Sequence, residues 1–323
     1  MKAPLFWSHK GLSSTLLLPL AALYWLLSWA RGKMTSPYRS HLPVICIGNL
    51  TSGGTGKTPV SAYLASALRE AGRRPVILSR GYGGALAGPV MVLPTHTAED
   101  CGDEPLLLRE IAPVVIARNR ADGTKFIEDI GNFDIILMDD GLQNPQLVKD
   151  ISIAVFDGEI GVQNNRIFPA GPMRTPLKKG LGEVDLCLMN GADKTGLKKA
   201  LAGRHIIGFT LQAGEMVPSP AKTKAVVAFA GIGRPARFFE TLETTGYQLA
   251  STNAFGDHHP YSEPELEMLL AQAKAHKAQL VTTQKDWVRL PKPWQKKIAY
   301  LPVSLHISSK DHESLMQVIQ QQG

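Results

Sequence analysis

The chain has 323 residues, 44% of them hydrophobic and 20% charged, and carries a formal net charge of +7. This length exceeds a usual single domain, so we expect one large or two medium globular domains and exclude a disulfide-stabilised miniprotein. Cys46, Cys101 and Cys187 lack paired or metal-binding spacing, which indicates a reducing, cytosol-facing compartment. The positive charge suits an anionic partner, and without interleaved aromatic and basic residues we expect a phospholipid surface or a phosphorylated substrate rather than nucleic acid.

The first predicted element is an apolar segment at residues 12–29 that contains no charged side chain. Basic residues bracket it: Lys2 and Lys10 before it, and Arg31, Lys33 and Arg39 after it. No convincing small-residue cleavage site follows, which argues against a cleaved secretory signal. The segment is short for a bilayer span and Pro19 weakens it, so a helix lying in the interface competes with a transmembrane one. Either way, the basic residues after it favour a cytoplasmic location for the rest of the chain, where ATP is available.

A glycine-rich loop then follows an apolar, strand-like run and precedes an amphipathic helical pattern. Glycines let backbone N–H groups turn toward a phosphate, Lys57 can reach the β and γ oxygens, and the Thr58 hydroxyl can ligate Mg²⁺. The usual pattern opens with glycine where this chain has Thr51. The context still predicts a loop that binds the phosphates of ATP or GTP, made of Thr51, Ser52, Gly53, Gly54, Thr55, Gly56, Lys57 and Thr58.

After this loop, short apolar β-like runs alternate with helical patterns, which predicts a parallel sheet covered by helices on both faces. The runs are residues 75–78, 114–117, 134–138, 151–156, 185–189 and 225–230. A stretch with two prolines and few apolar residues, 211–224, is typical of an interdomain connector. We therefore expect an α/β protein with a membrane-contact helix at 1–35, a P-loop core at 36–212, a connector at 213–224 and a smaller α/β domain at 225–323.

Two pairs of acids could carry chemistry beside this loop. Asp139 and Asp140 end an apolar run, and functional groups of parallel sheets gather at the carboxyl ends of strands, so we expect them near Lys57 with Mg²⁺. A strand that ends in Asp is also ordinary turn chemistry. Asp103 and Glu104 precede a helical run, where acids commonly serve as helix caps. Phosphoryl transfer to a hydroxyl nevertheless needs a carboxylate or histidine to deprotonate the acceptor.

Histidines and arginines in loops are less specific signals. The paired histidines in the loop at 257–261 are of a kind more often exposed than catalytic, and no further ligands at suitable spacing make a metal site with them. Arg80, Arg166 and Arg174 lie in glycine- or proline-rich loops, where they could bind phosphate bidentately or simply be surface residues of a basic protein.

Taken in order, these motifs resemble the tetraacyldisaccharide 4′-kinase family of Gram-negative bacteria. The resemblance covers nearly the whole chain and rests on GNLTSGGTGKTP, SRGYGG, GDEP, DDGLQN, NNRIFPAGPMRTP, FAGIGRP, FGDHHPY and TTQKDWVRL. It implies transfer of the γ-phosphate of ATP, with Mg²⁺, to the 4′-hydroxyl of a tetraacylated glucosamine disaccharide 1-phosphate, forming lipid IVA in lipid A biosynthesis. It further implies a monomer at the cytoplasmic face of the inner membrane. The anionic, acylated substrate accounts for the basic charge and the apolar segment.

The resemblance also assigns roles to residues. Asp103 and His258 would take the proton of the acceptor hydroxyl, with Asp139 as a further catalytic residue; which of the pair touches the hydroxyl stays open. The implied Mg²⁺ ligands are Thr58, Glu104 and Asp140, and the implied substrate-binding residues are Arg80, Asn144, Arg166 and Arg174. Asn144 stands where the family has histidine, and Leu142 stands where it has an aromatic residue. Because asparagine still forms hydrogen bonds, we expect a site that is altered but active.

Two rival functions are open on the residues alone. A membrane-tethered ATPase switch would carry lysine immediately before the two glycines, where this chain has Ser52. A kinase for small hydrophilic molecules would have no use for the leucine-rich amino terminus. Because Asp103 and His258 lie on opposite sides of the predicted connector, the lipid kinase reading further predicts that two domains close around ATP and lipid to assemble the site.

Overall fold

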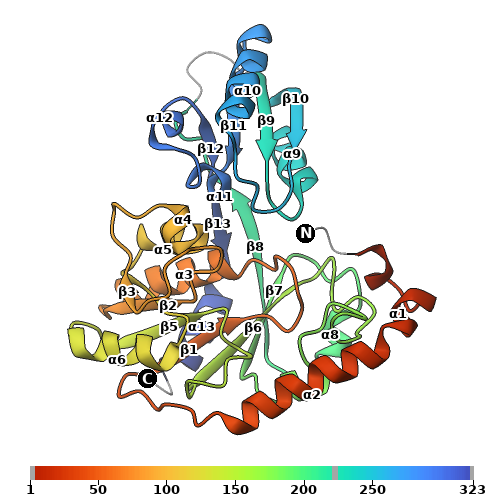
Figure 1. Ribbon diagram of the computed structural model, residues 1–323, viewed down its shortest axis with the longest axis vertical. Coiled ribbons are helices and arrows are strands. Elements are labelled where there is room, and N and C mark those ends of the chain that lie inside the picture. The colour runs from red at the N-terminus through yellow and green to blue at the C-terminus, as the bar shows by residue number, and fades with distance from the viewer. Residues whose placement is uncertain (1–3, 220–224, 321–323) are drawn as a thin grey trace.

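The computed structural model describes residues 4–219 and 225–320. They form a larger unit on a nine-stranded sheet and a smaller unit on a four-stranded sheet, and the smaller unit lies above the larger one in Figure 1. The α/β class expected from the sequence is confirmed. Ahead of the sheets come η1 (Leu5–Trp7), α1 (Leu12–Leu16) and α2 (Leu18–Met34), and α2 runs along the outside of the larger unit.

The larger sheet has the strand order β13-β8-β7-β6-β1-β5-β2-β4-β3. Its strands are β1 (Val44–Gly48), β2 (Pro75–Ser79), β3 (Val90–Met91), β4 (Val114–Ile116), β5 (Ile135–Asp139), β6 (Ile151–Asp157), β7 (Leu186–Asn190), β8 (Ile206–Ala213) and β13 (Val303–His306). Neighbouring strands are parallel except at the two edges, where β3 and β13 run antiparallel to their partners. Each apolar run that the sequence marked as strand-like forms a strand, with ends shifted by one residue at most.

Helices cover both faces of this sheet, which explains why its inner strands are continuous apolar runs. In β5, for example, Ile135 and Leu137 face one core while Ile136 and Met138 face the other. The first core is covered by α3 (Lys57–Glu70), α4 (Ala98–Cys101), α5 (Asp103–Arg109) and α13 (Ser309–Gln320), and the second by α6 (Arg120–Ile130), α7 (Leu177–Gly182) and α8 (Leu197–Ala200).

The smaller unit is a parallel sheet in the order β10-β9-β11-β12. Its strands are β9 (Ala225–Ala230), β10 (Gln248–Ala254), β11 (Gln279–Thr283) and β12 (Ala299–Leu301). Helix α9 (Pro235–Thr244) covers one face and α10 (Glu263–Ala275) the other, while the short helices α11 (Gln284–Trp287) and α12 (Lys292–Gln295) follow β11.

The chain returns to the larger unit at its end, which differs from the expected smaller domain at 225–323. The expected last strand near 298–303 is two strands divided at Pro302: β12 in the smaller sheet and β13 in the larger one. A proline supplies no N–H for a ladder hydrogen bond, so it suits this break between sheets. Helix α13 then buries Leu315 and Ile319 in the larger core, and residues 321–323 lie outside the described part.

The expected connector at 213–224 overlaps strand β8 at one residue, Ala213, which pairs with Val303 of β13. The polar residues just before it therefore belong to the strand next to the edge of the larger sheet. Residues 220–224 of the connector lie outside the described ranges. The two units are therefore joined by two strands that run through their junction (Figure 1).

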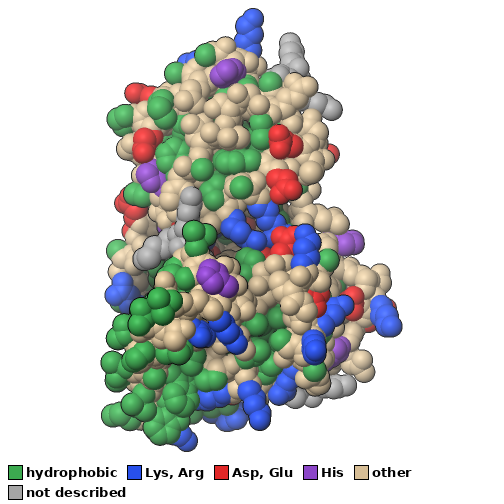
Figure 2. All heavy atoms as spheres, turned by 90° about the vertical axis from the view of Figure 1, so that its right-hand side faces the viewer, with side chains coloured by type: hydrophobic (Ala, Val, Ile, Leu, Met, Phe, Trp, Pro, Cys, Tyr) green, Lys and Arg blue, Asp and Glu red, His purple; other side chains and the backbone are tan. Residues whose placement is uncertain are grey.

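Helices α1 and α2 expose an unusual number of large apolar side chains. On α2 these include Leu20, Leu23, Leu26, Leu27 and Trp29. Figure 2 shows hydrophobic side chains gathered at this corner of the molecule, with lysine and arginine side chains beside them. Across the described ranges, no helix combines the length and apolar character that crossing a membrane requires.

Candidate active site

The glycine-rich loop lies between β1 and the start of α3. Gly56 has φ 96°, a left-handed conformation that glycine adopts without strain, and it turns the chain into the helix that begins at Lys57. The first N–H groups of α3 have no partner within the helix, and its amino end favours negative charge. The Thr55 hydroxyl is buried and has no hydrogen-bond partner among the described residues. This geometry suits an anion such as phosphate.

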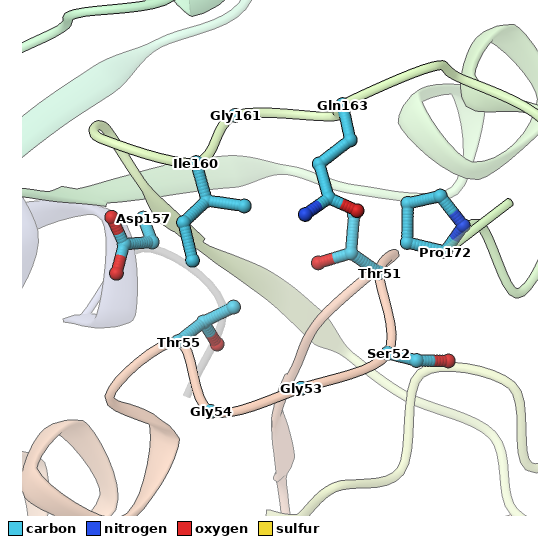
Figure 3. A pocket seen from close by; sticks show the side chains of 10 residues that line it. All are labelled: Thr51, Ser52, Gly53, Gly54, Thr55, Asp157, Ile160, Gly161, Gln163 and Pro172. Carbon is cyan, nitrogen blue, oxygen red and sulfur yellow. The ribbon is translucent and has the colours of Figure 1, made fainter. Parts of the chain in front are cut away.

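On one side the loop packs closely against the segment that follows β6. A cavity of only about 30 Å³ separates them, lined by Thr51, Ser52, Gly53, Gly54, Thr55, Asp157, Ile160, Gly161, Gln163 and Pro172. Figure 3 shows the side chains of Thr55 and Asp157 on the same side of this space. Asp157 also forms ion pairs with Arg234 and, at 3.4 Å, with Arg237 of the smaller unit. The loop is therefore next to one ionic contact between the two units.

Two acids emerge beside the loop because β5 is hydrogen-bonded to β1. Asp139 is 6% exposed and accepts a hydrogen bond from Ser61 Oγ on α3 at 2.8 Å. Burial, together with the neighbouring Asp140, raises the pKa of Asp139 to about 6. Asp140 lies 3.9 Å from Lys57 Nζ and 3.1 Å from an Arg174 nitrogen. Burial lowers the pKa of Lys57, and the Asp140 carboxylate opposes that shift.

A second acid–base pair joins the two units. Asp103 begins α5 in the larger unit, and His258 lies in the loop after β10 in the smaller one. The Nδ1 atom of His258 is 3.3 Å from Oδ2 of Asp103. The His258 side chain is about one-third exposed, whereas that of Asp103 is 5% exposed. An imidazole held by a carboxylate in this way can accept a proton from a bound hydroxyl.

The position of Asp103 depends on a close approach of two loops. Gly102 precedes Asp103 with φ 84°, and a Cβ atom there would lie 2.3 Å from the carbonyl oxygen of Tyr82. Only glycine fits this contact. The Tyr82 ring in turn packs edge-on against the imidazole of His258, with ring centroids 5.8 Å apart. The loop after β2 thus supports both members of the Asp103–His258 pair.

Cations from the segment after β11 reach the same carboxylates. Arg289 donates to Asp103 Oδ2 from Nε at 3.0 Å and from Nη2 at 2.5 Å. Lys285 Nζ lies 2.6 Å from Glu104 and 3.6 Å from Asp103. Burial alone would raise the pKa of Asp103, but His258, Lys285 and Arg289 outweigh it and hold that pKa well below its usual range. Burial would likewise lower the pKa of Lys285, and the two acids raise it instead.

Asp286 anchors this cationic segment inside the smaller unit. Its buried carboxylate accepts hydrogen bonds from the Gly231 N–H, from Tyr261 Oη at 2.9 Å and from Thr283 Oγ1 at 2.6 Å. It also forms an ion pair with Arg289 at 2.9 Å. The Arg289 guanidinium is therefore held between an acid of each unit.

Asp103, Glu104 and His258 also have the spacing of a metal site, since one potential ligand atom of each lies within 4.8 Å of the others. In this structure Lys285 and Arg289 already balance the charge of the two acids. Lys285 holds Oε1 of Glu104, so Glu104 would ligate Mg²⁺, as predicted, through its other carboxylate oxygen or by exchanging the contact with Lys285.

Among the described residues, no hydrogen bond or ion pair joins the four predicted substrate-binding residues to one another. Arg174 contacts Asp140 and Gln143 beside Lys57. Arg80 is exposed after β2 and pairs with no acid among the residues the structure describes. Asn144 exchanges hydrogen bonds with Gln146 in a turn, and Nη1 of Arg166 donates to Ser14 and Thr15 of α1.

Sequence reasoning assigned no role to Arg289, Lys285, Asp286, Tyr82 or Ser61. The signals were two quoted motifs: TTQKDWVRL, which places two cations and an acid directly after a strand, and SRGYGG, which contains Tyr82. Their contacts with the predicted site residues join distant parts of the chain, so spacing alone could not reveal them.

Comparisons with known proteins identify the family and the fold. The model of the family described as tetraacyldisaccharide-1-P 4′-kinase matches residues 13–322. Proteins named tetraacyldisaccharide 4′-kinase from Paramagnetospirillum magneticum and Rhodospirillum centenum are each 44% identical, over 94% of this chain and 94% and 92% of their own lengths. The crystal structure of LpxK from Aquifex aeolicus in complex with ATP shares the fold, with a TM-score of 0.78 and 24% identity over 96% of this chain and 99% of that one.

Proposed function

The chain belongs to the tetraacyldisaccharide-1-phosphate 4′-kinase family, and we propose that it transfers the γ-phosphate of ATP to the 4′-hydroxyl of a tetraacylated glucosamine disaccharide 1-phosphate. The product is lipid IVA, an intermediate of lipid A biosynthesis. The observation that carries this proposal is the contact of His258 with Asp103 at the junction of the units, in a chain whose glycine-rich loop leads into the amino end of α3. A phosphoryl-transfer enzyme needs both a phosphate cradle and a group that activates the acceptor.

On the nucleotide side, the free N–H groups of the loop and of α3 bind the β-phosphate, and Lys57 binds the β and γ oxygens. Arg174 lies next to Lys57 and supplies further positive charge to the transferred group. In the structure both cations contact Asp140, so the phosphates compete with that carboxylate for them.

The residues at the end of β5 fit a magnesium ion. They offer hard oxygen donors, and the raised pKa of buried Asp139 indicates that its anionic form lacks a fully compensating cation. Thr58, Asp139 and Asp140 would hold the ion, with Glu104 joining them through its other carboxylate oxygen or by exchanging the contact with Lys285. When bound, Mg²⁺ neutralises phosphate charge.

On the acceptor side, Asp103 orients the His258 imidazole through Nδ1, and the proton of the 4′-hydroxyl leaves toward this pair as the oxygen attacks. Each unit supplies one member, so the relative placement of the units sets the distance between acceptor and γ-phosphate. Domain closure around both substrates then controls the reaction and excludes water.

The substrate also explains the exposed apolar surface. Helices α1 and α2 lie in the interface of the inner membrane at its cytoplasmic face, with their leucines among the acyl chains and nearby basic residues against lipid phosphates. The enzyme works there as a monomer, without nucleic acid.

The test is transfer of labelled γ-phosphate from ATP to the tetraacylated disaccharide 1-phosphate in detergent micelles. A matched acceptor without the 4′-hydroxyl controls for other positions. Label in the first lipid and none in the second is the expected result. Hydrolysis of ATP with no lipid labelled would favour a membrane-tethered ATPase, and labelling of small hydrophilic alcohols alone would favour a different kinase.

A further inference from the structure

Arg289 makes a two-pronged contact across the junction of the units. Its Nε and Nη2 atoms both donate to Asp103 Oδ2, at 3.0 and 2.5 Å. The planar guanidinium fixes direction as well as distance, which a flexible ammonium group does not. With its side chain 9% exposed, Arg289 has little freedom to exchange this contact for water.

The remaining donor group of Arg289 ties it to the backbone that holds His258. Nη1 donates to the carbonyl oxygen of Gly231 at 3.1 Å, and the His258 N–H donates to the same oxygen at 3.0 Å. Nη1 also binds Asp286, which itself accepts from the Gly231 N–H. One short stretch of backbone therefore locates both the imidazole and the guanidinium that approach Asp103.

We propose that Arg289 is a positioning residue for phosphoryl transfer. It holds the Asp103 carboxylate in place against His258, because Arg289 and the His258 N–H both bind the carbonyl oxygen of Gly231. The inference rests on the proposed function and adds a residue to its machinery. Arg289 acts through Asp103 and touches no substrate. A displacement of the carboxylate by about 1 Å would cost roughly 100-fold in rate, as for other misplaced catalytic groups.

The alternative is that Arg289 merely docks one unit on the other. Arg237 provides the matched control, because it also pairs with an acid across the junction, Asp157 at 3.4 Å, but has no contact with Asp103. Arg234 still pairs with Asp157 when Arg237 is changed, so Arg237→Gln weakens a docking contact without leaving that acid unpaired. A docking role predicts that Arg289→Gln changes the KM values and the melting temperature, whereas a positioning role predicts that it lowers kcat.

The experiment measures kcat and the KM for ATP and for lipid in the full-length protein, with thermal melting of each variant. We expect Arg289→Gln to lower kcat by roughly 100-fold with the KM for ATP changed less than about threefold. Arg289→Lys should recover about tenfold of this loss, since lysine restores the positive charge but not the planar guanidinium with its two donors to Asp103. Arg237→Gln should keep kcat within about threefold of wild type.

A double-mutant cycle makes the test specific. In a His258→Ala background, Arg289→Gln should cost less than about threefold, because no imidazole remains to be aligned. The inference is overturned if the 100-fold loss persists in that background, or if Arg289→Gln leaves kcat unchanged and raises only KM. If Arg289→Gln fails to fold, the cycle with Arg289→Lys decides by the same criteria. If the wild-type protein labels no lipid, the proposed function is overturned together with this inference. If the wild type labels lipid, the results for the variants test the role of Arg289 alone.

Discussion

The Nδ1 atom of His258 lies 3.3 Å from Oδ2 of Asp103, although the two residues lie on opposite sides of the junction between the units. The larger unit alone holds the ion pair of Lys57 and Asp140, but the imidazole beside Asp103 comes from the smaller unit. Activity should therefore depend on where the smaller unit lies, and substitutions that move either residue should change the rate.

Replacing Gly102 should disturb this pair without touching any charge. A Cβ at position 102 would lie 2.3 Å from the Tyr82 carbonyl oxygen, and φ is 84°. We expect Gly102→Ala to lower the free energy of unfolding by roughly 1–3 kcal/mol and to lower kcat, because Asp103 must shift. Thermal melting and lipid phosphorylation measure the two effects. Gly182→Ala, where no atom of a neighbouring segment lies within 4 Å of the added carbon, is the control and should lower neither. Equal behaviour of the two variants would refute this role for Gly102.

Asp139 should trade stability for function. Its pKa is raised to about 6 in the folded protein, so the fold favours the protonated form. The protonated carboxyl group contributes on the order of 3 kcal/mol to the free energy of unfolding below about pH 4, and this contribution is lost as the pH rises through 6. Asp139→Asn, measured without nucleotide or metal, should therefore melt at a higher temperature than wild type at pH 7.5 but at a similar one at pH 4.5, and should be inactive. A variant that melts lower at both values would contradict the prediction.

The two arginines of the proline- and glycine-rich loop should have separable effects. Arg174 contacts Asp140 beside Lys57, whereas Arg166 holds α1 through Ser14 and Thr15. We expect Arg174→Ala to lower kcat/KM by 10- to 100-fold, roughly the value of a charge-assisted contact to phosphate. Arg166→Ala should keep kcat within about threefold and instead speed proteolysis of the amino-terminal helices. Steady-state kinetics and limited trypsin digestion distinguish the two variants. A loss of kcat/KM in Arg166→Ala but not in Arg174→Ala would instead place the phosphate site at Arg166.

Membrane binding should depend on the exposed face of α2. The triple change Leu23→Gln, Leu26→Gln and Leu27→Gln should weaken flotation with anionic phospholipid vesicles by at least about tenfold, because each leucine buried in lipid contributes roughly 1.5–3 kcal/mol. Met268→Gln is the control, since it removes an exposed apolar side chain of the smaller unit. Undiminished flotation of the triple variant would place the membrane contact elsewhere.

Much of the fold could be predicted because buried parallel strands leave a plain signal. Runs such as 135–139 are apolar on both faces and end in acids, so strand, sheet type and the position of Asp139 near Lys57 follow together. Strand β10 escaped notice because QLASTNA is half exposed at a sheet edge. The return of β13 to the larger sheet was missed for a different reason: it depends on a pairing with β8 that no local pattern encodes.

A site residue could be predicted from the sequence only where a motif also implied the residue that it contacts. Lys57 and the acids after β5 are joined by a general rule of parallel sheets. The network around Arg289 depends on how two units dock, which the sequence does not express. For Arg166 the sequence suggested phosphate binding, and the structure adds a contact that no motif implied, since Nη1 donates to a serine and a threonine of α1.

The most direct test of the account is the initial rate of phosphate transfer to the tetraacylated disaccharide 1-phosphate by wild type, Asp103→Asn, His258→Ala and the double variant. If the two residues act as one unit, each single change should cost roughly 10²- to 10⁴-fold and the double change no more than the worse single one. Single variants that retain wild-type rates, or losses that multiply in the double variant, would contradict a shared acid–base pair across the two units.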